Sequence, residues 1–488
     1  MSALTDTLHT FRKTSHTQRE KGNYFENLAK LYFQNEPRYN DLYSNVWLPI
    51  TPDQHNDWVA QRDNSFSEFL SLGNKKDDST VALFANYSRG IATSRDTWCY
   101  NASKRAIASN MTRMAEFFNS EVKRYSSACD GLAKSQYPDI EEFINTNKTK
   151  ISWSRGLKND LARHVQHPFQ LDALVIGVYR PFTKSHVYFS KYYNDMVYQM
   201  PRIFPKDGIK NLVIMVKQGK SGSGQFSLMM NCVPDLQTDG GSQCFPLYLY
   251  EPSDTAEKPD LFKVQGKSDG EYSVNDGITD AGLQHFKDAY KGAEISKEAL
   301  FYYIYGLLHS EDYKKRYADN LSKELPRIPA VKKFADFQAF STAGRKLADL
   351  HINYETVEPY PVTIEGGALL LGTFTDADYR VTQMKFASKA DKTRVVYNHK
   401  ITMSDIPLEA YDYVVNGKPA LEWVMERQAV TTHKDSGIVN DANLWATETM
   451  GDAAYPLKLF QRVITVSVET MKIVRALPRL DIAVTVKG

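Results

Sequence analysis

The chain has 488 residues, of which 42% are hydrophobic and 24% charged, with a formal net charge of +2. This length exceeds what one core supports, so an ordinary globular protein of two or three domains is expected. The sequence contains no apolar run long enough to cross a membrane and no signal-peptide pattern, which argues against a membrane protein or a secreted one. Four widely spaced cysteines without a CxxC pair predict neither a zinc site nor a disulfide framework, and favour the cytoplasm.

The first half of the chain is predicted to be rich in strands. An opening helix is expected at residues 20–34, which Pro37 ends. Residues 81–101 predict two strands joined by a turn at Arg89-Gly90, and a second helix is expected at 103–125. Five apolar segments with Gly-, Lys- and Ser-rich turns between them then predict strands at 171–182, 186–190, 211–217, 226–233 and 243–252.

From Ser296 onward the apolar spacing becomes helical, and Ser310 is a predicted N-cap. The pair Asn416-Gly417 predicts the C-cap of one helix, directly before a second helix. The expected helices of this part are 297–310, 310–326, 334–355, 407–415, 418–428 and 454–475, with a strand section at 363–403. The predicted fold class is therefore α+β, with a strand-rich first part and a largely helical C-terminal lobe.

Charge is distributed unevenly along the chain. Residues 151–220 hold eleven Lys or Arg against four Asp or Glu, whereas residues 231–300 hold six against thirteen. Within the basic part, residues 179–205 combine eight aromatic side chains with four Lys or Arg. A basic face with an acidic back is typical of a nucleic-acid-binding protein, although two ordinary surfaces produce the same numbers. An aromatic piece of core with solvated cations is the alternative reading of residues 179–205.

No catalytic motif is found. Gly219-Lys220-Ser221 match the end of a phosphate-binding loop, but Ile214 occupies the position of its first glycine, so we exclude a nucleotide site. A flexible basic loop that contacts phosphates through Lys217, Lys220 and Ser221 is favoured instead. The sequence also lacks the Pro-Pro pair of adenine methyltransferases and a GxSxG motif. We therefore expect no catalytic residue, no metal site and no cofactor.

Several stretches in a constant order resemble one family, the type ISP restriction-modification proteins. They are TPDQHNDWVAQRD, NYSRGIATSRDTWCYN, YRPFTKSHVYF, MVYQMPRIFP, SQCFPLYLYE, YIYGLLHSEDYKKRYADNLSKELPRIP, AGRKLADLHINYE, IPLEAYDYVVNGKPALEWVMERQ and SGIVNDANLWA. Such proteins carry an Mrr-like nuclease, a helicase-like ATPase, a coupler, an N6-adenine methyltransferase and a C-terminal target-recognition region in one polypeptide. The resemblance covers about residues 50–485 and is to the target-recognition region.

The segment 1–48 is similar to a different part of the same family, the opening helix of the nuclease. Glu26 would match the acidic residue that this helix contributes to the metal site, but a lone Glu does not hold a metal ion for cleavage. The resemblance thus implies two ends of a longer enzyme joined near Trp47, without the catalytic middle. The implied division is a nuclease remnant at 1–48, a DNA target-recognition domain at 49–295 and a helical or mixed C-terminal lobe at 296–488.

The function implied by the resemblance is sequence-specific recognition of double-stranded DNA, without catalytic activity and without a membrane partner. Intact restriction-modification subunits are a second candidate partner. A regulatory or protein-interaction remnant and a cryptic adenine-specific DNA methyltransferase are the alternatives. Basic and hydroxyl side chains contact DNA phosphates and bases. On this ground the candidate DNA-binding residues are Arg89, Arg95, Arg180, Lys184, Lys191, Arg202, Lys217, Lys220 and Ser221.

Overall fold

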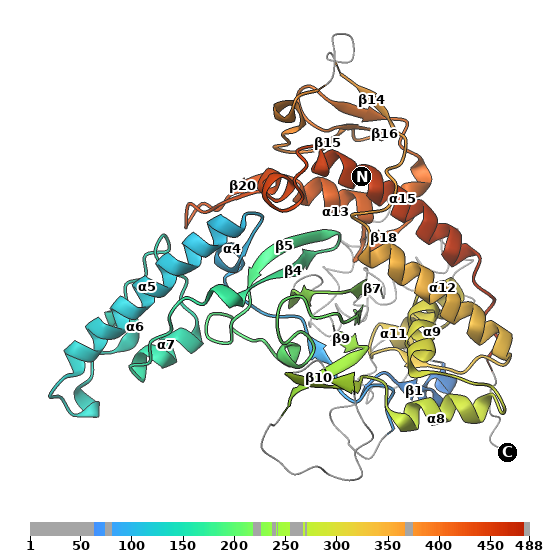
Figure 1. Ribbon diagram of the computed structural model, residues 1–488, viewed down its shortest axis with the longest axis horizontal. Coiled ribbons are helices and arrows are strands. Elements are labelled where there is room, and N and C mark those ends of the chain that lie inside the picture. Colours follow the sequence, from blue (N-terminus) through green and yellow to red (C-terminus); the bar gives the residue numbers. More distant parts are fainter. Residues whose placement is uncertain are drawn as a thin grey trace, which may run out of the picture. The chain divides into compact units, whose positions relative to one another are not determined.

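The structure is a computed structural model (Figure 1). It describes residues 63–73, 81–217, 226–236, 241, 243–253, 267–268, 271–366 and 374–482, all within the unit Arg62–Gly488. The opening helix predicted at 20–34, with Glu26, lies outside the described residues, as does the junction near Trp47. Helices and small sheets follow one another along the described part, so the predicted α+β class is confirmed.

One four-stranded sheet is built on a long hairpin. Strand β4 (Leu174–Arg180) pairs antiparallel with β5 (Thr183–Tyr188). Strand β3 (Tyr100–Asn101) joins the free edge of β5, and β8 (Val233–Pro234) pairs parallel with β4. The apolar run of β4 does not alternate with polar residues, which is typical of a strand covered on both faces. Strand β4 is therefore largely covered, and its last two residues, Tyr179 and Arg180, are half-buried.

A second four-stranded sheet has the order β2-β9-β6-β7. Its strands are β2 (Ser88–Arg89), β9 (Gln243–Pro246), β6 (Val213–Val216) and β7 (Ser227–Met230). A three-stranded sheet lies next in the chain and consists of β10 (Tyr248–Pro252), β12 (Tyr272–Asp276) and β11 (Lys267–Ser268). The strand segments predicted between 171 and 252 are confirmed.

The hairpin predicted at residues 81–101 is wrong. Strand β2 pairs with β9 and β3 pairs with β5, while the short helix α4 (Asp96–Cys99) separates them. Pairing with β9 and β5 is favoured because each is a longer and largely buried strand, whereas two strands of two residues alone would form a marginal hairpin.

A long helix follows these strands. Helix α5 (Lys104–Cys129) begins at Ser103, whose side chain accepts a hydrogen bond from the Ala106 N–H. Its buried face includes Ile107, Met111 and Phe118, as the sequence spacing predicts. The chain then returns through the short helix α6 (Ile140–Phe143) and through α7 (Arg155–Ala162), which packs on α5 (Figure 1).

The helices predicted at 297–310, 310–326 and 334–355 are confirmed. They are α9 (Lys297–His309), α10 (Glu311–Arg316) with α11 (Ala318–Leu321), and α12 (Phe334–Ile352), preceded by α8 (Asp280–Ala289). The Ser310 hydroxyl caps α10 by accepting from the Tyr313 N–H. Helices α9 and α12 touch through glycines, because a Cβ at Gly344 would lie 1.9 Å from the Tyr302 carbonyl oxygen.

The rest of the lobe combines helices with small sheets. One sheet has the order β14-β17-β16-β15. Its strands are β14 (Thr363–Glu365), β17 (Thr402–Ser404), β16 (Asp391–Val396) and β15 (Lys385–Ser388). Other elements are β1 (Leu70–Ser71) paired with β13 (Arg327–Ile328), β20 (Val430–Thr432) paired with β21 (Val439–Asp441), α13 (Ala420–Arg427), α14 (Ala442–Leu444), a π-helix (Trp445–Thr449) and α15 (Tyr455–Arg475). Among the described residues, no helix is both long and apolar enough to cross a membrane.

The C-cap predicted at Asn416-Gly417 is wrong, and the helix expected before it is only a short 3-10 turn at Leu408–Tyr411. The two residues form the turn of a hairpin between β18 (Val414–Val415) and β19 (Lys418–Pro419), with φ of 52° and 72°. Two successive positive φ angles define a type I′ turn, for which Asn-Gly is the preferred pair. The same dipeptide thus serves a strand pair where we expected a helix end.

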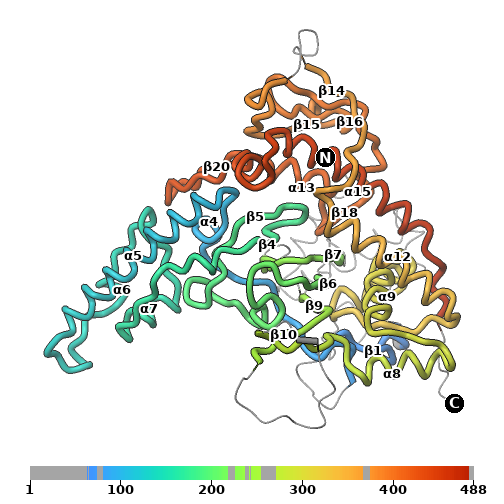
Figure 2. The backbone as a smooth tube through the Cα atoms, in the orientation of Figure 1, coloured from blue at the N-terminus to red at the C-terminus, as the bar shows by residue number. Residues whose placement is uncertain are grey.

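Within the described residues, two clusters of buried apolar side chains form the core. The first gathers side chains from within 91–249 and 354–468, and the second from within 66–84, 214–247 and 278–348, with Val474 and Ile482. Figure 2 shows that the end of the chain packs against an earlier part of it, since the red α15 runs beside the yellow to orange α12. Both clusters use residues from either side of residue 296, so the division predicted there is not a boundary between cores. It stays a prediction.

Candidate nucleic-acid interface

The segment from Ser88 to Asp96 joins parts of the chain that are far apart in sequence. The Ile91 N–H donates to the Pro234 carbonyl, and the backbones of Ala92 and Met196 are paired by two hydrogen bonds of 2.8 and 2.9 Å. Arg89, at the start of this segment, is exposed and makes no ion pair with any described residue. Of the candidate DNA-binding residues, it is one that the structure leaves available to a phosphate.

Arg95 lies in the interior instead, with 4% of its surface exposed. Its Nη1 donates to the Tyr193 carbonyl, while Nε and Nη2 have no hydrogen-bond partner within the described residues. Removal from water lowers the pKa of this guanidinium. A direct contact with DNA would require the surrounding loop to open, so Arg95 holds the loop in the structure as it stands.

Arg180, at the end of β4, is fixed by carboxylates and by an aromatic ring. Its Nη1 lies 2.6 Å from the Asp235 carboxylate, which is 1% exposed. The guanidinium is 4.0 Å from the centre of the Tyr179 ring, and Asp96 lies 3.9 Å away. The Arg180 side chain remains 14% exposed, so part of it is still accessible to a ligand. A guanidinium that is already held in one position loses little conformational entropy when it binds a ligand.

Lys184, in β5, belongs to a buried network with the C-terminal lobe. Its Nζ lies 2.7 Å from the Glu355 carboxylate, and the Tyr455 hydroxyl donates to the same carboxylate at 2.5 Å. Burial raises the pKa of the Tyr455 phenol well above its usual value, so the phenol keeps its proton. The network joins β5 to the segments after α12 and at the start of α15.

The remaining candidates differ in how they are held. Lys191 is exposed, 5.1 Å from the Tyr192 ring centre, and makes no ion pair with a described residue. Arg202 is paired with Glu251, and the Lys217 ammonium donates to the Asn416 side chain at 2.6 Å. Two candidates lie outside the described residues, namely Lys220 and Ser221. Whether any of these residues contacts DNA stays a prediction.

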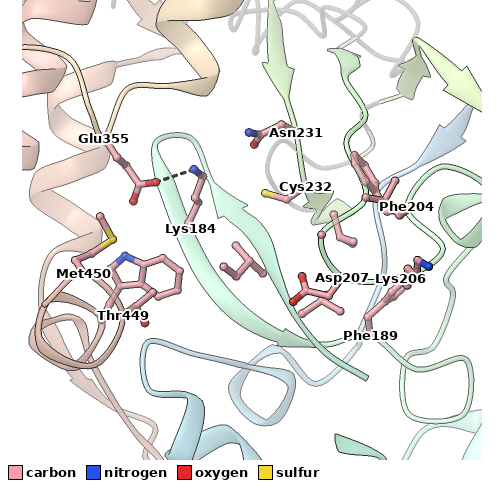
Figure 3. Close-up of a pocket in the computed structure, with 16 residues that line it drawn as sticks. Lys184, Phe189, Phe204, Lys206, Asp207, Asn231, Cys232, Glu355, Thr449 and Met450 are labelled. Carbon is pink, nitrogen blue, oxygen red and sulfur yellow. Dashed lines mark hydrogen bonds and ion pairs between the residues drawn. The ribbon is translucent and has the colours of Figure 1, made fainter. Parts of the chain in front are cut away.

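A cavity of about 300 Å³ opens beside Lys184 (Figure 3). Its lining includes the aromatic side chains of Phe189, Phe204 and Trp445. Figure 3 shows Glu355 on one side of the cavity and Phe204 on the other. Strand β5, the loop before β6 and the π-helix supply the walls, so segments far apart in sequence meet here.

The polar groups of this cavity are few. Asn231 is half-buried and makes no hydrogen bond with a described residue, whereas the Thr449 hydroxyl lies 3.1 Å from His186 Nε2. Burial raises the pKa of the Cys232 thiol to about 12, so the thiol is neutral near pH 7. Asp207, another residue of the lining, is exposed.

A second, smaller cavity of about 60 Å³ adjoins the first and shares Lys184 and Trp445 with it. Gln428 borders it with 5% exposure, and its Oε1 has no hydrogen-bond partner among the described residues. Arg427 Nε, on the same wall, has none either. Buried polar atoms are normally paired, so this space is suited to ordered water.

The sequence did not single out Glu355, Asn231 or Trp445. Glu355 is 171 positions from Lys184, so no local pattern joins the two. The usable signal was indirect, because Glu355 and Trp445 lie in AGRKLADLHINYE and SGIVNDANLWA, two of the stretches that carry the family resemblance.

Within the described part of the chain, no three His, Cys, Asp or Glu side chains lie together as metal ligands would. Burial raises the pKa of Cys99, like that of Cys232, to about 12, which disfavours a reactive thiolate at either position. The geometry of the described residues thus offers aromatic, amide and basic groups for binding rather than a recognisable catalytic constellation.

The chain belongs to the type ISP family, because the model of the type ISP C-terminal specificity domain matches residues 82–459. This match includes the segment with Arg89, the β4–β5 hairpin and the cavity beside Lys184. Among the curated proteins, none matches the sequence.

Solved structures of related enzymes agree with this assignment. A nuclease-deletion mutant of the type ISP restriction-modification enzyme LlaGI, in complex with a DNA substrate mimic, is 32% identical over 90% of this chain, with a TM-score of 0.74. The ATP-dependent type ISP enzyme LlaBIII bound to DNA is 34% identical over 89% of this chain, with a TM-score of 0.73. The DrdV–DNA complex is 29% identical over 88%, with a TM-score of 0.69. The chain spans only 37%, 25% and 40% of these three chains, respectively.

Proposed function

We propose that this chain binds double-stranded DNA and reads its sequence as the target-recognition part of a type ISP restriction-modification system. The observation that carries the proposal is the likeness, at more than 30% identity and over about nine tenths of the chain, to two type ISP enzymes solved with DNA. The basic composition of residues 151–220 supports it, since phosphate contacts need Lys and Arg.

The proposed contacts fall into two groups. Arg89 and Lys191 are exposed cations without an ion pair to a described residue, and we assign them to phosphates. Arg180 is held on Tyr179 by Asp235 and stays partly exposed, and we assign its guanidinium to readout of a guanine. We expect Lys184 to contact DNA only when bound DNA reaches the cavity that this lysine borders.

The finer parts of the proposal are that the chain has no catalytic activity of its own, acts in the cytoplasm, and works with intact restriction-modification subunits. The sequence lacks the motifs of the ATPase and the methyltransferase, which supports the first part. Incubation with duplex DNA, Mg²⁺, ATP and S-adenosylmethionine should yield neither cleavage nor transfer of a labelled methyl group. Methyl transfer would overturn this part and favour the cryptic methyltransferase.

DNA binding is tested by fluorescence anisotropy with a pool of random duplexes at about 50 and 200 mM salt, where a binder of several phosphates weakens markedly. The test variant is Arg89→Ala/Lys191→Ala, because removing Arg180 or Lys184 would leave a buried carboxylate unpaired and confuse binding with stability. The matched control is Lys287→Ala/Lys291→Ala, which removes two exposed cations from the acidic part of the chain.

The test double variant should bind more weakly, and its plot of log affinity against log salt should be shallower by about two, one for each lost phosphate contact. The control variant should match the wild type. Equal slopes for both variants would refute the assignment of Arg89 and Lys191. Absence of DNA binding at both salt concentrations would refute the proposed function and favour a protein-interaction role.

A further inference from the structure

The cavity beside Lys184 has the size and walls of a site for a small planar ligand. Its volume of about 300 Å³ is at the lower end of the range of small-molecule sites, roughly 300–1,000 Å³. Phe204 and Trp445 are each only 4% exposed and are therefore fixed by the core, while Phe189 is half-buried. Rigid aromatic walls favour a flat, aromatic ligand over a flexible aliphatic one.

The charges of the cavity favour a neutral ligand. Lys184 is balanced by Glu355 at 2.7 Å, and Lys206 is paired with Glu271 at 2.8 Å. Asp207 adds an exposed carboxylate to the lining. A phosphate or a carboxylate would have to compete with the buried Glu355 for Lys184, whereas a neutral ring leaves this ion pair intact.

Two polar side chains remain for recognition at the edge of such a ring. The Asn231 amide offers a donor and an acceptor, and no described residue uses either. Asp207 offers carboxylate oxygens, which accept hydrogen bonds. An amide pairs with the amino group and ring nitrogen of adenine, and a carboxylate accepts from the amino group of cytosine.

We propose that this cavity binds a neutral nucleobase that carries an exocyclic amino group, adenine or cytosine, with Asn231 on its polar edge and Phe189, Phe204 and Trp445 around its ring. The base has two sources, a free nucleoside and an unpaired base of bound DNA. The DNA source rests on the proposed function, whereas the free nucleoside does not.

The first experiment titrates the full chain with matched nucleosides by calorimetry. Adenosine is compared with inosine, and cytidine with uridine, because each second member carries an oxygen in place of the amino group. An amino-bearing nucleoside should bind about tenfold more tightly than its comparator, as one good amide–base pair discriminates. Asn231→Ala should remove the preference for adenosine over inosine. Asn159→Ala, an exposed position on α7, is the matched control and should keep it.

The second experiment compares a fully paired duplex with the same duplex carrying one unpaired adenine. When the base comes from DNA, the unpaired adenine should tighten binding about tenfold, as stacking of one base on aromatic side chains does. Asn231→Ala should reduce that gain, because the amide contact is lost while the stacking remains, and should leave the affinity for the paired duplex unchanged. Affinity for the paired duplex reports the proposed function separately.

Each combination of results decides the proposal. A preference that depends on Asn231 in either experiment supports it and identifies the source of the base. Its absence in both experiments overturns the proposal, even when the paired duplex binds well and the proposed function stands. Thermal melting of both alanine variants confirms that they fold, which we expect because neither side chain donates or accepts a hydrogen bond within the described residues.

Discussion

Replacing Gly344 by alanine tests how closely helices α9 and α12 must pack. An ideal Cβ at this position lies 1.9 Å from the Tyr302 carbonyl oxygen, far inside the 3.4 Å at which ordinary contact begins. The three nearest obstructing atoms, including the Gly306 nitrogen at 2.8 Å, belong to backbone and cannot rotate away. The helices must therefore separate and loosen the buried contacts of Phe340 and Leu347.

Overpacking of this kind costs typically about 1–3 kcal/mol, and alanine returns up to about 1 kcal/mol through its higher helix propensity. Since this clash is with backbone, we expect a net loss of about 2 kcal/mol, seen as a lower urea midpoint in circular dichroism. Gly156→Ala is the control, because its nearest atom is Ser154 Oγ at 3.8 Å, and it should be neutral or slightly stabilising. A Gly344→Ala midpoint at or above that of the wild type would refute the reasoning.

Three further predictions concern buried groups and a turn. Burial lowers the pKa of His351 to about 3, so the unfolded state binds this proton at a higher pH than the folded state does. The free energy of unfolding should therefore fall as pH drops from about 6.5 toward 3, by up to about 1.4 kcal/mol per pH unit. His351→Gln should make the urea midpoint depend less on pH, and an unchanged pH dependence would contradict this. Glu355→Ala should lower the free energy of unfolding by about 3–5 kcal/mol, because it leaves Lys184 unpaired. The double variant Lys184→Met/Glu355→Met should recover most of this loss in thermal melts. Equal losses in the single and double variants would argue against burial of the Lys184 charge. Gly417→Ala should cost about 1–2 kcal/mol, because φ is 72° there, and a wild-type midpoint would count against a fixed turn.

Sequence periodicity predicted the elements whose stability is local. Helices α5, α9, α12 and α15 were predicted because apolar spacing and caps such as Ser310 are contained in the element itself. The hairpin at 81–101 was wrong because strand pairing depends on partners elsewhere in the chain. The Asn416-Gly417 turn was misread for the opposite reason, since helical spacing on both sides outweighed a strong local turn signal.

The candidate site was predictable only in part. The sequence indicated a basic, aromatic segment and placed Arg180 at a strand end, which the structure confirms. It could not show that Arg95 is buried, because burial depends on the packing of the loop around Tyr193. The cavity beside Lys184 was also out of reach, since its walls come from segments that only the fold brings together.

The two interleaved cores have a consequence for synthesis on the ribosome. The first cluster contains side chains up to Leu249 that must wait for Leu457 to Val468 in α15 before it is complete. At about 5–20 residues per second, this interval of about 200 residues lasts roughly 10–40 s. Throughout it the nascent chain exposes apolar surface that the finished protein hides. We therefore expect chaperone supply and translation speed to govern the yield of folded protein in cells.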